Sequence, residues 1–210
     1  MTRIVCLSDT HNRQGAFEVP DGDLLIHAGD LTGRGTLSEV NAAIAWLEAL
    51  PHRDKIVIAG NHDFLFESEN ALARSLITRM VYLEDSEVAI QGLRIWGSPW
   101  QPWFYDWAFN LRRGQKLREK WAQIPEAIDI LVTHGPPMGT MDVTTSGEAV
   151  GCEELRDRLA AMVKPPRLHV FGHIHEGHGI VRTARTTSVN ASICDVAYRP
   201  VHSPLVIDLD

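Results

Sequence analysis

Five short apolar runs, each ending at polar residues that can bind a metal ion, constrain the fold of this sequence more than any other feature. Near-continuous stretches of Val, Ile and Leu are typical of strands buried on both faces of a sheet. The runs lie at 3–7, 23–28, 55–59, 129–133 and 168–171. Because segments with helical spacing alternate with them at 36–50 and 151–163, the sequence predicts an α/β layered domain with a mixed sheet as its core.

Two further stretches are expected to add strands. Segment 81–96 is typical of short strands joined by turns, and the tail from 180 onward alternates like a hairpin. The chain shows no internal repeat and no linker rich in Gly or Ser. At 210 residues, 44% of them hydrophobic, it is predicted to form a single domain over 1–210.

Charge and hydropathy narrow the classes of function. No apolar stretch reaches the roughly 18 to 20 residues of a membrane span, and the N-terminus lacks the apolar core of a signal peptide, so we expect a cytoplasmic protein without a membrane anchor. A net charge of −7 argues against stable binding of nucleic acid, which favours a basic surface. The basic cluster at 112–120 is expected to be a solvated helix face rather than a phosphate-binding track.

Residues of metal-ligand type follow all five runs. In an open α/β sheet the loops at the carboxyl ends of the strands meet at one edge, so these residues are expected to share one site. Alternation along extended chain would also bring Asp9 beside His11 and His173 beside His175. The candidate ligands are Asp9, His11, Asp30, Asn61, His134, His173 and His175.

This ligand set is too large for one ion and suits two divalent ions that share a carboxylate. Carboxylate and imidazole favour Mn²⁺, with Fe or Zn²⁺ as alternatives, and the absence of thiolates disfavours a structural zinc site. Two such ions about 3.5–4 Å apart form a clamp for displacement at phosphorus, with a bridging hydroxide as nucleophile. Four positive charges against two carboxylates and one hydroxide leave a single positive charge, which would attract a phosphodiester monoanion.

Glycines at 29, 60 and 172 are expected to let the chain turn where the strands end.

The ordered motifs resemble a known signature. Asp9-x-His11, Gly29-Asp30, Gly60-Asn61-His62-Asp63, His134 and Gly172-His173-x-His175 together resemble the calcineurin-like metallophosphoesterases. The segments "HAGDLT", "WGSPWQPWFYDWAFN", "VTHGPP", "RLHVFGHIHEG" and "VNASIC" extend the likeness, over nearly the whole chain, to the metallophosphoesterase-domain-containing phosphodiesterases of animals. The resemblance implies a four-layer α/β/β/α sandwich and hydrolysis of small phosphodiesters, with 2′,3′-cyclic nucleotides favoured.

The resemblance also implies roles for individual residues. The first metal would be bound by Asp9, His11 and His175, the second by Asn61, His134 and His173, and both by Asp30. His62 would protonate the leaving oxygen, a role that suits a histidine near neutral pH. Many phosphatases of the superfamily orient this histidine with an aspartate where this sequence has Gly33, so we expect His62 to lean on another group or on solvent. Arg34 matches a phosphate-contacting arginine of some relatives, and a plain turn residue is the alternative.

Segment 96–109 is unusually aromatic. It contains Trp96, Trp100, Trp103, Phe104, Tyr105, Trp107 and Phe109. One interpretation is a wall on which a nucleobase stacks, worth ~1–3 kcal/mol per base, with Trp100 or Phe104 facing the site. The favoured alternative is a plug over the sheet or a subunit contact in a homodimer.

The remaining histidines are not expected to bind metal. His27 and His169 lie inside apolar runs and are predicted to be buried and hydrogen-bonded. His52 and His202 flank prolines and are expected at the surface, and His178 is expected to be a bystander of the ligand pair.

Three rival functions stay open at this point. A phosphomonoesterase or protein phosphatase would use the same metals. A nuclease would need a basic groove that this acidic chain lacks. A nucleotide-binding regulator with little turnover is the non-enzyme alternative, motivated by Gly33 and opposed by the intact His173. For the favoured hypothesis, a phosphodiesterase, the expected partner is a small phosphoester or nucleotide substrate.

Overall fold

The computed structural model describes residues 1–210, and two β-sheets face each other at its centre. The strands of the first sheet are β1 (Thr2–Leu7), β2 (Leu24–His27), β3 (Asp54–Val57), β4 (Val81–Tyr82) and β13 (Leu205–Leu209). Their order is β13-β1-β2-β3-β4. β1 to β4 are parallel to one another, and β13 runs antiparallel beside β1.

The second sheet has six strands. They are β5 (Ser86–Ile90), β6 (Leu93–Ser98), β9 (Ile130–Thr133), β10 (Leu168–Phe171), β11 (Gly179–Arg182) and β12 (Thr187–Asn190), in the order β11-β12-β10-β9-β6-β5. The four inner strands are parallel and both edge strands are antiparallel, which confirms the short strands predicted within 81–96 and the hairpin predicted after 180. The five apolar runs are all strands, but they are divided between two mixed sheets and do not share one.

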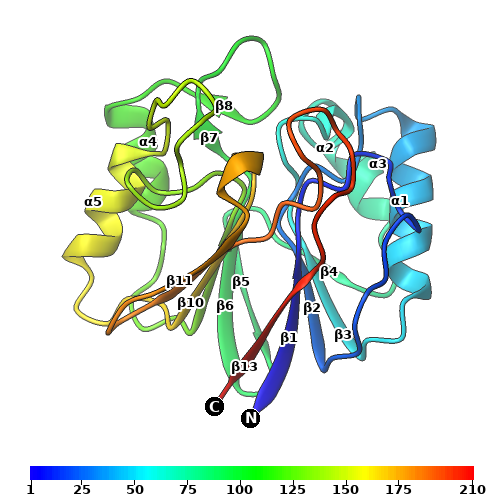
Figure 1. Cartoon of the computed structure of the whole chain (residues 1–210), viewed down its shortest axis with the longest axis horizontal. Helices are drawn as coiled ribbons and strands as arrows, with labels where there is room; N and C mark the ends of the chain where they lie inside the picture. The colour runs from blue at the N-terminus through cyan, green and yellow to red at the C-terminus, as the bar shows by residue number, and fades with distance from the viewer.

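Five helices cover the outer faces of the two sheets (Figure 1). They are α1 (Leu37–Ala49), α2 (Phe64–Ser68), α3 (Asn70–Ser75), α4 (Gln115–Trp121) and α5 (Glu153–Ala161). The first three lie against the first sheet and the last two against the second, so the predicted four-layer α/β/β/α sandwich is confirmed. A small parallel pair, β7 (Gln101–Pro102) and β8 (Asn110–Leu111), lies above the second sheet.

Alternation along the strands explains the three apolar cores. Ile4 and Ile26 point between the sheets and pack with Ile130 and Val170 of the opposite sheet. Their neighbours on the strands point outward, as Leu25 does toward the helices of the first layer. Each strand is therefore buried on both faces, which is why the runs are almost continuously apolar.

The helix limits follow local signals. Thr36 caps α1, and its hydroxyl and the Glu39 carboxylate form a reciprocal capping box. The helices predicted at 36–50 and 151–163 are confirmed as α1 and α5. The predicted basic face at 112–120 is wrong in part, because α4 begins only at Gln115, and Lys120 is paired with Asp85.

Most of the histidines expected outside the site lie as predicted. His27 and His169 are buried, each beside a threonine hydroxyl at 3.0 and 2.8 Å, although Nδ1 of His27 has no partner. The expectation for His52 is wrong, since the ring is buried and donates to the carbonyl of Pro20 at 3.0 Å. The three cysteines are buried free thiols. None of the helices has the length and apolar character needed to cross a bilayer.

The parallel strands of both sheets end at the same edge of the sandwich, opposite to the two chain termini (Figure 1). There the backbone of Ile193 donates to the carbonyl of Ser8 at 2.9 Å, which ties the strand ends of the two sheets together. The loops that follow these strands carry the candidate ligands.

Candidate metal centre

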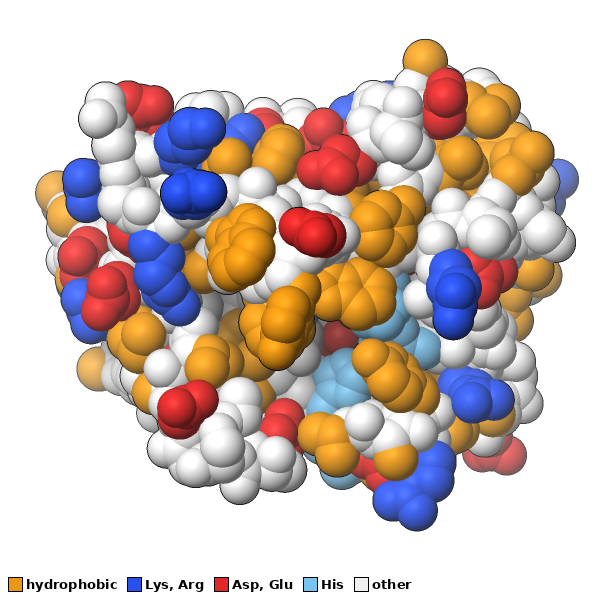
Figure 2. Space-filling view, turned by 90° about the horizontal axis from the view of Figure 1, so that it is seen from above, with side chains coloured by type: hydrophobic (Ala, Val, Ile, Leu, Met, Phe, Trp, Pro, Cys, Tyr) orange, Lys and Arg blue, Asp and Glu red, His pale blue; other side chains and the backbone are white.

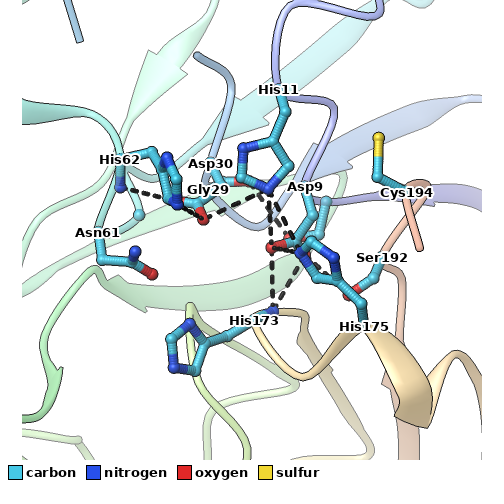
Figure 3. A network of polar contacts seen from close by, with 12 residues as sticks. Asp9, His11, Gly29, Asp30, Asn61, His62, His173, His175, Ser192 and Cys194 are labelled. Atoms are coloured by element: carbon cyan, nitrogen blue, oxygen red, sulfur yellow. Dashed lines mark hydrogen bonds and ion pairs between the residues drawn. The ribbon is translucent and has the colours of Figure 1, made fainter. Parts of the chain in front are cut away.

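The first ligand group joins the two sheets. Asp9 and His11 follow β1, and His175 follows β10. Nε2 of His175 lies 3.2 Å from Oδ1 of Asp9 and 3.3 Å from Nε2 of His11, and all three residues are buried (Figure 3). Their ligand atoms are close enough to hold one metal ion.

Asp30 lies between this group and a second one. Its Oδ2 atom is 3.6 Å from Nε2 of His11 and 3.5 Å from Nε2 of His134. On the far side, Oδ1 of Asn61 lies 2.9 Å from Nε2 of His134, and the ring of His173 is centred 5.0 Å from that of His134. The structure thus brings all seven predicted ligands to one place, with Asp30 in the middle.

Backbone carbonyls fix the tautomers of three of these histidines. Nδ1 of His11, His134 and His175 lies 3.2, 3.0 and 2.9 Å from the carbonyls of Thr32, Ala28 and Asp195, respectively. A carbonyl oxygen only accepts hydrogen bonds, so each Nδ1 carries the hydrogen and each Nε2 presents its lone pair to the cluster. When these rings are neutral, their Nε2 lone pairs converge with the carboxylate oxygens, which is the ligand set that a divalent cation requires; at His134 and His175 a proton competes with the cation for Nε2.

The electrostatics of the cluster also favour the binding of a cation. Burial would raise the pKa of Asp30, but the neighbouring histidines outweigh it, and its pKa lies well below the usual range. The pKa values of His134 and His175 are raised to about 9, because the carboxylates of Asp30 and Asp9 overcome the effect of burial. Burial lowers the pKa of His173 to about 3. The carboxylates thus stay ionised and attract positive charge into a buried place.

The backbone reaches this arrangement through rare conformations. Asp9, His11, Asp30 and His173 have φ values of 53°, 41°, 55° and 68°. Such left-handed conformations are uncommon outside glycine and cluster at functional sites. Asp9 and His11 do meet, with Nε2 of His11 3.9 Å from Oδ1 of Asp9, but the expected route through extended chain is wrong. Figure 3 shows the His173 ring on the side of Asn61, away from the ring of His175.

The glycines of the motifs serve two purposes. Gly29, with φ of 98°, makes the turn predicted for it. At Gly60 and Gly172 the reason is close approach instead, because a Cβ atom would lie 2.3 Å from Oδ1 of Asp30 and 2.0 Å from Oδ2 of Asp9. These two positions must lack a side chain for the carboxylates to fit.

His62 stands beside the cluster and is held by a backbone atom. Its Nδ1 lies 2.7 Å from the carbonyl oxygen of Gly33, and its Nε2 lies 4.0 Å from Oδ2 of Asp30. The indole of Trp107 packs on the ring, with centroids 4.1 Å apart. Gly33 therefore supplies the orienting acceptor itself, through its main chain.

Sequence reasoning missed two groups that support the ligands. Ser192 donates from its hydroxyl to Oδ2 of Asp9 at 2.8 Å. Asp63, fully buried, accepts hydrogen bonds from the backbone of Leu31, Thr32 and Gly60, and so ties the loops after β2 and β3 together. Both residues lie in the quoted motifs, "VNASIC" and "GNHD", which was the available signal.

The aromatic segment is divided between packing and the site. Phe104 lies beside His173, with ring centroids 6.4 Å apart. Trp100 instead donates to Asp85 and packs on Phe109, so the structure does not bring it to the cluster. Trp107, which packs on His62, lies at the cluster where Trp100 was expected. Figure 2 shows apolar side chains gathered around histidines near the centre of this face of the molecule.

A cleft of about 890 Å³ opens beside the cluster. Its walls include His11, Arg34, His62, Trp107 and Tyr198. Arg34 thus lies in the same cleft as His62, as a phosphate contact requires. Tyr198, whose ring is centred 4.7 Å from that of His11, was not predicted. His178 stays outside the ligand groups and stacks on His202 at 4.2 Å.

Comparisons with known proteins agree with this geometry. The family described as calcineurin-like phosphoesterase matches residues 2–177. Human and mouse metallophosphoesterase domain-containing protein 1 are each 51% identical, over 99% of this chain and 71% of theirs. A UPF0046 protein of Caenorhabditis elegans is 40% identical, over 99% of this chain and 80% of its own.

Proposed function

The chain belongs to the calcineurin-like phosphoesterase family of metal-dependent phosphoesterases, and we propose that it is a dinuclear phosphodiesterase acting on small phosphodiesters, cyclic nucleotides among them. The observation that carries the proposal is the position of Asp30 between two groups of acceptor atoms. One carboxylate that faces both groups is the arrangement that two adjacent ions share.

The proposed ligands follow from these contacts. The first ion would be held by Asp9, His11 and His175, the second by Asn61, His134 and His173, and Asp30 would face both. Carboxylate, amide and imidazole ligands favour Mn²⁺, with Fe or Zn²⁺ as alternatives. When bound, the two ions supply the activated nucleophile and neutralise the charge that develops on the phosphoryl oxygens.

The proposed acid is His62. The Gly33 carbonyl holds Nδ1 as a donor, so that Nε2 faces the cluster and delivers its proton to the leaving oxygen. Arg34, in the same cleft, is proposed to contact the phosphoryl group. A neutral carbonyl fixes the ring without adding negative charge beside an anionic substrate.

Two features favour a phosphodiester. Two divalent ions, two carboxylates and one hydroxide leave one positive charge, which matches a diester monoanion better than a monoester dianion. The aromatic ring of Phe104 lines the hollow beside the cluster and suits a nucleobase. The 2′,3′-cyclic class is favoured by the family resemblance.

A substrate panel tests the proposal. Purified protein with added Mn²⁺ is assayed on bis(p-nitrophenyl) phosphate, p-nitrophenyl phosphate, and both 2′,3′- and 3′,5′-cyclic nucleotides. We expect hydrolysis of diesters that a chelator abolishes. Turnover of the monoester alone would indicate a phosphomonoesterase, and nucleotide binding without any turnover would indicate a regulator.

Four further expectations from the sequence remain predictions. They are a single domain over 1–210, residence in the cytoplasm, a homodimer, and the lack of stable binding to nucleic acid.

A further inference from the structure

Three hollows form one continuous track across the candidate centre. The middle one, over Asp30 and Asn61, shares His62, Trp107 and Tyr198 with the cleft on one side. On the other side it shares Phe104, His173 and Glu176 with a cavity of about 340 Å³. We call this cavity the His173 pocket, and its walls include Trp103, Phe104, Arg113, Pro136, Val150 and His173.

We propose that the His173 pocket binds the ester group that stays on phosphorus, and that this group is a nucleoside. The inference rests on the proposed function, since it places the leaving oxygen of a diester on the His62 side of the centre and the base of the nucleoside that keeps the phosphoryl group on the His173 side; in a cyclic nucleotide one pentose carries both ester oxygens, and its base takes the His173 pocket. Apart from His173, none of the residues that line this pocket is assigned to the metals or to the acid.

The position of His62 sets the direction of the substrate. In hydrolysis a water oxygen bonds to phosphorus, the bond from phosphorus to the leaving oxygen breaks with its electron pair, and that oxygen takes a proton from Nε2 of His62. The leaving oxygen must therefore lie next to His62, which lines the cleft and the middle hollow and is absent from the His173 pocket. The oxygen that stays on phosphorus, and the base of the nucleoside attached to it, then lie on the His173 side.

The walls of the pocket suit a planar heterocycle. Phe104 and Trp103 are 50% and 57% exposed, so a base stacked on them would cover apolar surface that now faces water. The Phe104 ring lies 6.4 Å from the ring of His173, so a base stacked on Phe104 would lie beside a proposed ligand of the second ion.

Polar groups at the pocket offer both kinds of hydrogen-bond partner. Arg113 is already fixed by donation to the carbonyls of Gly151 and Val150, at 2.9 and 2.8 Å, so its guanidinium is held in place. Glu176 accepts from the backbone of Thr145 at 2.7 Å and adds a carboxylate. Donors and an acceptor beside aromatic walls favour a nucleobase over a plain alkyl group.

Two substrates with the same leaving group test this assignment. Thymidine 5′-(p-nitrophenyl phosphate) and methyl p-nitrophenyl phosphate both release p-nitrophenol, and they differ only in the group that stays on phosphorus. With Mn²⁺ added, we expect kcat/KM of the wild-type protein to be about 5- to 150-fold higher for the thymidine ester, as stacking of one base predicts. Phe104→Ala should remove this preference by acting on the thymidine ester alone, and Phe104→Tyr should keep it.

Trp107→Ala is the matched control on the other side. It packs on His62, so it should change the rates of both esters by the same factor and leave their ratio intact. An equal loss on both esters in Phe104→Ala, or an unchanged ratio, would overturn the assignment.

A binding measurement separates this inference from the proposed function. If the wild-type protein hydrolysed neither ester, the proposed function would be wrong, and calorimetry with thymidine 5′-phosphate would still test the pocket. We expect Phe104→Ala to weaken that binding by at least fivefold, with binding of methyl phosphate unchanged. Equal binding of thymidine 5′-phosphate to both proteins would contradict the assignment.

Discussion

The imidazole of His62 donates to the main-chain carbonyl of Gly33 across 2.7 Å. A side-chain carboxylate is thus not needed to orient this ring. A Cβ atom at Gly33 would lie 2.9 Å from Nδ2 of Asn12, which is itself bonded to Glu39 at 2.6 Å. The space that an aspartate would need is therefore taken up by another pair of side chains.

The first prediction concerns the acid. Replacing His62 by asparagine should lower kcat by about 10²–10⁴-fold on a diester with an alkyl leaving group, because an alkoxide leaves poorly without a proton. The loss on a p-nitrophenyl ester should be much smaller, and metal content, measured by mass spectrometry, should stay at the wild-type value. A normal rate on the alkyl ester would exclude the acid role.

The second prediction concerns Asp30. Asp30→Asn keeps the shape of the side chain but removes the charge that faces both ligand groups. We expect the protein to bind at most one ion and to lose measurable activity. Asp142→Asn is the matched control, since Asp142 is equally buried but accepts only from the backbone of Gly139 and Gly151. That variant should lose stability and keep its metals; loss of metal in both variants would show that the effect is general.

The third prediction concerns the close approach at Gly172. In Gly172→Ala the new methyl group would meet Oδ2 of Asp9 at 2.0 Å and Oγ of Ser8 at 2.2 Å. We expect a shift of the carboxylate, loss of at least the first ion, and a free energy of unfolding lower by about 1–3 kcal/mol. Gly135→Ala is the control, because its nearest contacts are 3.8 Å away. Wild-type metal content in Gly172→Ala would contradict the structure.

The fourth prediction concerns acid stability. Burial lowers the pKa of His169 to about 3, against roughly 6.5 in the unfolded chain. Between these values the unfolded state binds one more proton, so stability falls as the pH drops from about 6.5 toward 3. His169→Gln keeps an N–H donor for Thr133 and removes the titration. The free energy of unfolding of this variant, measured with urea at pH 4 to 6, should fall less steeply with falling pH than that of the wild type. The two slopes should differ by about 1.4 kcal/mol per pH unit. Parallel curves would show that His169 is not the source.

The fold and the convergence of the candidate ligands could largely be predicted from the sequence. Apolar runs fix strands, and residues such as Asp9 and His134 had to meet because both follow parallel strands that end at one edge. The runs alone did not reveal two sheets, since a strand buried between two layers looks the same in either arrangement.

Other parts of the site cannot be predicted from the pattern of side chains in the sequence. The partner of His62 is a main-chain carbonyl, which every residue carries, so no motif marks it. The sequence does not favour Trp107 over Trp100, because neighbouring aromatics in an irregular segment have no periodicity to separate them. Tyr198 lies in a loop between β12 and β13, far from any ligand in sequence.

Each proposed ion takes ligands from both sheets. Asp9 and His11 belong to one half of the sandwich and His175 to the other, and the second ion would likewise join Asp30 and Asn61 to His134 and His173. The pair of ions would thus act as a cross-link across the open edge, and parting of the halves there would pull the ligands off the metals. Metal binding and closure of this edge would then be coupled. In protein stripped of metal, the amide hydrogens at the strand ends around the centre should exchange faster than in the metal-bound protein.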